Sequence, residues 1–249
     1  MSLIDLLICA NIFFVPPFLV LLEFEMKFNL KMTALSLSGA VLLSGATAHA
    51  DEEHYDIGVW NDNGVLMTGG WDHDTESMAV SSLRVFEAEF GEDPSFPFSI
   101  DEPGIGGAAA DVGLAEGSTI KLSLAAGISA WNGNGFSATS SSMNVSFGPG
   151  SVDSGTGGDL DFLVADDYDY HPIFSIDNNA AVGSYLLQFS VSVDGLTSSD
   201  PFWIVFNLGM EEEAYEESVE WVEGNLVPAP GAIGLLAMAG LASSRRRRS

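Results

Sequence analysis

The chain has 249 residues and carries 35 acidic against eight basic side chains, a formal net charge of −27. So acidic a surface repels nucleic-acid phosphates and anionic lipid headgroups, which excludes a nucleic-acid partner. Its one cysteine, Cys9, stands near the start, so the remainder must be held by burial, or by burial plus metal, without disulfides.

Residues 1–25 are mainly apolar from Leu3 to Leu22, but Pro16 and Pro17 interrupt the run and acidic residues follow it. Paired prolines break a helix, and an acidic flank fits neither orientation of a membrane span. We therefore expect translation to start at Met26, with residues 1–25 an upstream extension. A genuine membrane span is the less favoured alternative.

Residues 26–50 have the layout of a secretory signal peptide. Two lysines precede a short apolar core, and a small-x-small cleavage signal follows at Ala48 and Ala50. The core is too short for a comfortable membrane span. The sequence therefore predicts cleavage before Asp51 and export of the body that follows.

Residues 51–209 read as strands separated by turns rich in Gly, Asn, Asp and Ser. Four segments alternate apolar and polar residues with a period of two, and a fifth is an almost continuous apolar run typical of a buried strand. These segments are Leu83–Phe90, Ile120–Leu124, Met143–Phe147, Tyr185–Val193 and the apolar Phe202–Leu208. Many short strands of this kind predict an all-β domain, an antiparallel β-sandwich.

Residues 210–226 contain seven glutamates, with Tyr215, Val219 and Val222 at helical spacing. Two interpretations fit: a short helix on the sandwich, or a self-repelling acidic stalk that lifts the domain off a membrane. The sequence slightly favours the stalk, because a spacer is needed there and the charge density opposes burial.

Residues 227–249 form an anchor-like tail. Val227, Pro228 and Pro230 begin it, an apolar stretch from Gly231 to Ala242 follows, and four arginines end it, Arg245, Arg246, Arg247 and Arg248. Arginines directly behind an apolar helix stay on the cytoplasmic side of a membrane. The tail predicts a single transmembrane helix that leaves the acidic body outside.

This three-part tail resembles the PEP-CTERM sorting signal, with Ala229 in place of the glutamate of Pro-Glu-Pro. The resemblance implies export machinery and an exosortase-type sorting enzyme as partners. It also implies a location in the cell envelope or at the cell surface, membrane-anchored before the tail is processed, with an extracellular polysaccharide matrix nearby.

The body shows none of the common catalytic signatures: no Gly-x-Ser-x-Gly elbow, no phosphate-binding glycine loop and no cysteine nucleophile. We therefore expect a protein that catalyses no reaction. Its three histidines, His54, His73 and His171, each have acidic neighbours, and Asp56 shares a strand face with His54. Imidazoles with a carboxylate or water suit tetrahedral zinc, whereas solvated surface histidines are the plainer interpretation.

A further resemblance concerns the stretches H-x-D-I-G-V, D-H-D, GEDPSFPF, GLAEGSTIKLSL, HPIFSI and GSYLLQFSVSVDG. Together they are similar to the surface-anchored domain of zinc-regulated PEP-CTERM proteins. The resemblance implies a zinc site at His54, His73 and His171, with Asp56 as a fourth ligand. The family has a second histidine before D-H-D and a paired H-x-H near the third site, which are single histidines here.

A second metal candidate is the loop with Asp153, Asp159 and Asp161, followed by Asp166, Asp167 and Asp169. Its carboxylates and glycines suit Ca²⁺, but the regular spacing of a calcium loop is missing. The sequence thus favours an exported surface protein that binds zinc or a matrix component. The alternatives are an acidic structural protein of an exopolysaccharide matrix without a specific metal site, and, at low weight, a secreted hydrolase using carboxylates.

Overall fold

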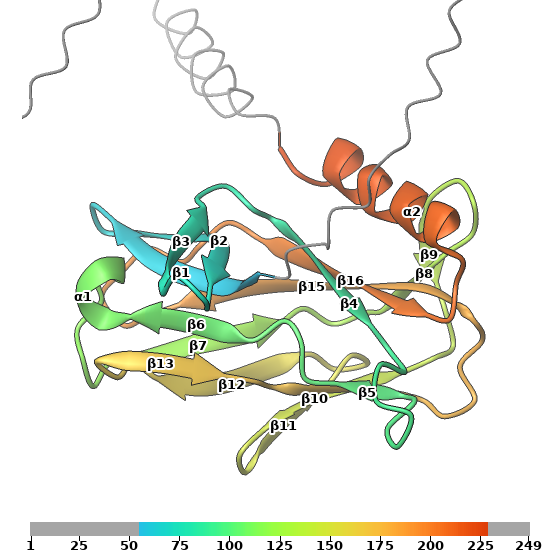
Figure 1. Ribbon diagram of the computed structural model, residues 1–249, viewed down its shortest axis with the longest axis horizontal. Helices are drawn as coiled ribbons and strands as arrows, with labels where there is room; N and C mark the ends of the chain where they lie inside the picture. The colour runs from blue at the N-terminus through green and yellow to red at the C-terminus, as the bar shows by residue number, and fades with distance from the viewer. Residues whose placement is uncertain (1–54, 229–249) are drawn as a thin grey trace, which may run out of the picture. The chain divides into compact units, whose positions relative to one another are not determined.

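The computed structural model describes residues 55–228. The predicted cleavage signal at Ala48 and Ala50, the candidate ligand His54, and the tail from Pro230 to Arg248 lie outside the described residues. Within residues 55–228 the chain is mostly β-strand, with two helices and three sheets (Figure 1). Neither described helix is long and apolar enough to cross a membrane.

The first sheet has five strands and carries the candidate site. Its neighbouring strands are antiparallel except for one parallel pair, β1 with β6. In spatial order the strands are β13 (Asp167–Tyr170), β6 (Ile105–Ala108), β1 (Asp56–Asp62), β2 (Val65–Asp72) and β3 (Ser77–Val80).

The second sheet is the largest, and β4 and β16 are its one parallel pair. It runs β12 (Gly158–Leu163), β7 (Thr119–Leu124), β15 (Gly183–Ser192), β16 (Phe202–Leu208) and β4 (Val85–Glu89), with β8 (Ser129–Trp131) and β9 (Phe136–Ala138) attached beside β15. The third runs β11 (Gly150–Asp153), β10 (Met143–Phe147), β14 (Ile173–Ile176) and β5 (Ser99–Ile100).

All five segments predicted as strands contain one, namely β4, β7, β10, β15 and β16. A turn of the predicted Asn- and Gly-rich kind follows β1. Asn63 and Gly64 both have positive φ, 53° and 93°, and Asp62 pairs with Val65 across them. Two left-handed residues in a two-residue loop match the twist of the flanking strands, which is why Asn-Gly occupies it.

A single apolar core joins the sheets, with Ile57 from the first, Leu122 from the second and Phe174 from the third. The period-two prediction for β15 holds on its core face, where Phe189 is 1% exposed while Gln188 is exposed and Ser190 half-buried. Leu186, on the opposite face, is also buried. A second covering element must therefore lie on that face.

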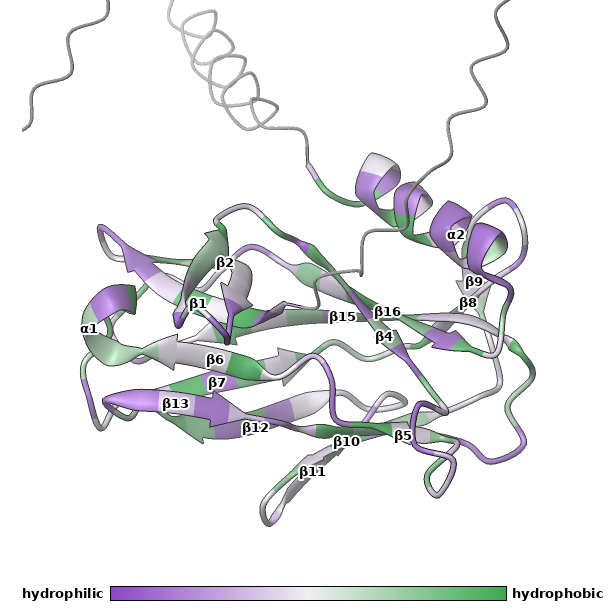
Figure 2. Cartoon of the chain, in the orientation of Figure 1, coloured by the Kyte–Doolittle hydropathy of each residue, from purple (hydrophilic) through white to green (hydrophobic). Residues whose placement is uncertain are grey.

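That element is α2 (Glu212–Asn225), and a short α1 (Ala109–Val112) is the other helix. Tyr215, Val219 and Val222 of α2 pack on Leu186 and Val205 of the large sheet. Of the two interpretations of the glutamate-rich segment, the structure thus has the helix, not the stalk that the sequence slightly favoured. Figure 2 shows α2 as mainly hydrophilic with hydrophobic residues at intervals. Apolar spacing outweighs charge density because the glutamates can face solvent.

Candidate metal centre

Four strand ends meet at one end of the first sheet. Asp56 begins β1 and pairs with Trp71, next to the end of β2. The parallel pairing of Ile57 with Ile105 brings the start of β6 beside the start of β1, and Tyr170, the last residue of β13, pairs with Ile105 as well. This end of the sheet therefore brings together five residues from separate segments: Asp56, His73, Gly104, Asp169 and His171.

The side chains converge as the backbone predicts. Asp56, Asp169 and His171 each present one potential ligand atom, and these three atoms all lie within 4.8 Å of one another. Nε2 of His171 lies 2.9 Å from Oδ1 of Asp169, and Nε2 of His73 lies 3.6 Å from Oδ2 of the same aspartate. Within residues 55–228 this is the one group of three or more metal-ligating side chains that approach so closely.

Asp56 is the deepest of these groups, with 7% of its surface exposed. Its Oδ1 accepts a hydrogen bond of 2.8 Å from the backbone N–H of Gly104. Burial raises the pKa of the Asp56 carboxyl, and this outweighs the opposing effects of the Gly104 N–H and of His171. Burial therefore makes ionisation of Asp56 more costly than that of an aspartate in water.

Gly104 leaves the space that the site needs. A Cβ atom at this position would lie 2.6 Å from Oδ1 of Asp56 and 3.1 Å from Cε1 of His171. The first distance is shorter than real side chains allow, so any larger residue would displace the Asp56 carboxylate. Glycine lets the backbone N–H approach that carboxylate directly.

His171 is held from both sides of its ring. Nδ1 lies 3.0 Å from the backbone oxygen of Asp101 and 3.3 Å from Oε1 of Glu102. In the neutral imidazole, an Nδ1–H that donates to the Asp101 oxygen leaves the Nε2 lone pair directed at Asp169, the arrangement of a metal-binding histidine. Burial alone would lower the pKa of His171, but the Asp101 oxygen and the carboxylates of Glu102 and Asp169 together raise it.

His73 is the outermost group, with a side chain 66% exposed, in the turn between β2 and β3. Asp72 shapes this turn, because its Oδ1 accepts hydrogen bonds from the backbone N–H groups of Asp74 and Thr75, at 2.8 and 3.1 Å. The imidazole thus stands at the rim of the cluster on a short, hydrogen-bonded turn.

Of the predicted set His54, Asp56, His73 and His171, the structure brings Asp56 and His171 together and places His73 beside them through Asp169. Asp169 itself was not in that set. Its signal was present in the sequence, since residues 169 and 171 are two apart and point to one face of an extended chain.

The predicted calcium candidate does not gather into a comparable group. Oδ1 of Asp153 accepts a 2.7 Å hydrogen bond from the N–H of Gly155 within its own turn. Asp159 and Asp161 lie on β12, beside Lys121 and Ser123 of β7: Asp161 is 3.0 Å from the Lys121 ammonium, and Asp159 accepts a 2.7 Å hydrogen bond from Ser123. These carboxylates already have partners within the protein.

Comparisons with protein families, with curated proteins and with solved structures return no match.

Proposed function

We propose that the protein is an exported, envelope-anchored surface protein that binds zinc through Asp56, Asp169, His171 and His73 and catalyses no reaction. The observation that carries the proposal is the approach of Asp56, Asp169 and His171 to within 4.8 Å, from strand ends far apart in the sequence. These two carboxylates and one imidazole supply three ligands, and the His73 imidazole, 3.6 Å from Asp169, is the nearest candidate for the fourth. Four nitrogen and oxygen ligands of this kind suit tetrahedral zinc.

Zinc fits this group better than calcium. Imidazole nitrogen is a common zinc ligand, whereas calcium takes six to eight oxygen ligands. A divalent cation would also stabilise the buried ionised carboxylate of Asp56. Its hydrogen bond comes from the Gly104 N–H, and the nearby His171 and His73 act on it through their charge. The outer partners of His171, Asp101 and Glu102, resemble those that orient metal-bound histidines.

The location and finer architecture belong to the same proposal. Export rests on the signal-like residues 26–50, and anchoring rests on the arginine-ended tail with its resemblance to a PEP-CTERM signal. The shared core of Ile57, Leu122 and Phe174 supports a sandwich of packed sheets. The main rival, an acidic matrix protein without a specific site, is supported by the charge alone.

Isothermal titration of the metal-free chain with zinc distinguishes these two functions. We expect one site per chain, and a loss of affinity in Asp169→Asn and in His171→Ala greater than the roughly 10–100-fold cost of losing an outer partner. Asp167→Asn is the matched control, because Asp167 is an exposed aspartate two residues from Asp169 on the same strand. Equal zinc binding in all four proteins would favour the matrix protein.

A further inference from the structure

A second feature lies next to the candidate metal centre. An open pocket of about 710 Å³ is formed by the loop after β4, by β5 and by the start of β14. Asp101 lies between the two features. Its backbone oxygen contacts His171, and the same residue lines the pocket. The pocket shares no side chain with the proposed zinc ligands.

Apolar side chains make part of the pocket. Phe96 is 62% and Ile173 48% exposed, which is unusual for such large apolar groups, and the buried Ile100 also lines the pocket. Turn hydrogen bonds hold the Phe96 loop in place: Phe96 N–H donates to the Asp93 oxygen at 2.9 Å, and Ser99 N–H donates to the Phe96 oxygen at 3.0 Å. The ring is thus presented to solvent by a shaped loop, which lowers the ordering cost of binding.

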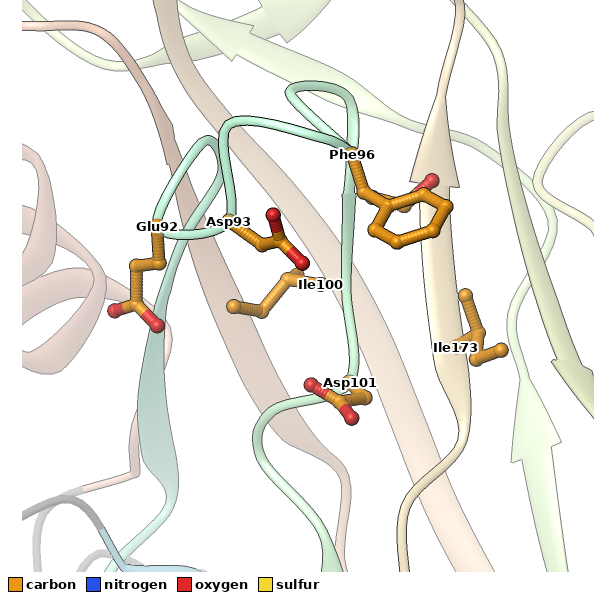
Figure 3. A pocket seen from close by; sticks show the side chains of 7 residues that line it. Glu92, Asp93, Phe96, Ile100, Asp101 and Ile173 are labelled. Carbon is orange, nitrogen blue, oxygen red and sulfur yellow. The ribbon is translucent and has the colours of Figure 1, made fainter.

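The charged groups of the pocket are all acidic. Glu92, Asp93 and Asp101 line it, and no basic side chain does within the described residues. In Figure 3, Asp93 and Asp101 lie on one side of the β5 segment and Phe96 and Ile173 on the other, so a ligand that touches both sets must extend across it. Ionised carboxylates only accept hydrogen bonds, so the complementary ligand donates them and bears positive charge.

We propose that this pocket binds an amine-bearing sugar within a polysaccharide chain. Ammonium and hydroxyl groups of such a sugar donate to Asp93 and Asp101, and the apolar face of the ring packs on Phe96, whose π face also attracts a cation. An acidic polysaccharide is excluded by repulsion from the three carboxylates. The pocket is open rather than enclosed, so it can admit one sugar of a longer chain.

The test is titration of the full-length chain, kept metal-free with a chelator, with a glucosamine tetramer. We expect saturable binding that weakens at least about tenfold in Phe96→Ala and in Asp93→Asn. Leu163→Ala is the control for Phe96, because Leu163 is an apolar residue 56% exposed on β12, and Asp74→Asn is the control for Asp93. Neither control should change the affinity.

Two further ligands separate recognition from bulk charge. The N-acetylated tetramer, which lacks the positive charge, should bind at least about tenfold more weakly. The proposal is overturned if tetralysine binds as tightly as the glucosamine tetramer, or if Phe96→Ala leaves sugar binding unchanged while its melting temperature shows an intact fold. Because the metal is absent throughout, failure here leaves the zinc proposal untouched, and zinc affinity should be normal in Phe96→Ala.

Discussion

At the scale of single residues, Asp56 is under two opposing demands. Its burial disfavours the ionised form, yet a zinc ligand must be ionised. A carboxyl whose pKa is raised by folding contributes stability below its unfolded pKa and loses it as the pH rises through the raised value. At neutral pH the metal-free protein therefore carries the cost of the buried charge.

Asp56→Asn should relieve that cost. The amide oxygen still accepts from the Gly104 N–H, and the uncharged group no longer opposes burial. We expect the metal-free variant to melt about 2–4 °C higher than the parent at neutral pH, equivalent to about 1 kcal/mol, and to lose the stabilisation by zinc. Scanning calorimetry with and without zinc measures both, and a lower melting temperature without zinc would contradict the assignment.

His171 sets the pH dependence of zinc binding. Its pKa is raised, so protons compete with zinc at a pH above the ordinary histidine value of about 6.5. In the metal-free protein the protonated form of His171 contributes stability below 6.5 that is lost as the pH rises through the raised pKa. The zinc-induced rise in melting temperature should have the opposite trend and fade on acidification through this range. A zinc effect that persists to about pH 5 would point to carboxylates alone.

The sequence predicts those parts of the site that lie close together along the chain. Asp56 and His171 could be predicted as ligands because each has acidic neighbours, and Asp169 could have been added because it stands two residues before His171. The role of Gly104 was not, because it comes from the parallel register of β1 and β6 and the close approach to Asp56. Pairing between segments about 50 residues apart leaves no local pattern.

At the scale of elements, β15 shows where a pattern of period two is sufficient. Phe189→Asp places an unpartnered charge in the core and should lower the free energy of unfolding by about 3 kcal/mol or more. Ser190→Asp, on the half-buried face, should cost under about 1 kcal/mol. Urea unfolding of the two variants makes the comparison, and equal costs would refute the assignment of faces.

The α2 helix shows where local pattern was insufficient. Its glutamates suggested a stalk, whereas the apolar face opposite Leu186 and Val205 decides for a packed helix. The signal was the nearly continuous apolar run of Phe202–Leu208, which indicates a strand buried on both faces and therefore a cover on each side of the sheet.

Val222→Ala tests this packing, since Val222 has no exposed surface. Removing its two methyl groups should cost about 1–3 kcal/mol. Glu223→Ala, on the exposed face of the same helix, should change stability by less than about 0.5 kcal/mol. If denaturant unfolding gave equal values, α2 would not be anchored to the sheet in solution.

At the scale of the whole molecule, charge is separated along the chain. The acidic residues are concentrated between Asp51 and Leu226, where Arg84 and Lys121 are the only basic residues, and the arginine cluster is confined to the tail. Such a body stays soluble in salt, where screening limits self-repulsion, and it attracts divalent cations in general. Specific zinc binding must therefore be distinguished from attraction to the surface as a whole.

The arginine cluster yields a prediction about location. If Arg245–Arg248 halt translocation, replacing all four with serine should release the full-length protein across the membrane. Fractionation of cells that produce the parent and the variant measures this. Unchanged location and tail processing would show that the arginines do not act as a stop-transfer signal.

The zinc content of the natively purified chain, measured by mass spectrometry at neutral pH beside the Asp169→Asn and Asp167→Asn variants, tests the central proposal most directly. We predict one zinc ion per chain in the parent and in Asp167→Asn, and a marked loss in Asp169→Asn. Two results would contradict a site built from Asp56, Asp169, His171 and His73. One is a parent protein that contains no zinc and takes up none when zinc is added, and the other is equal zinc content in all three proteins.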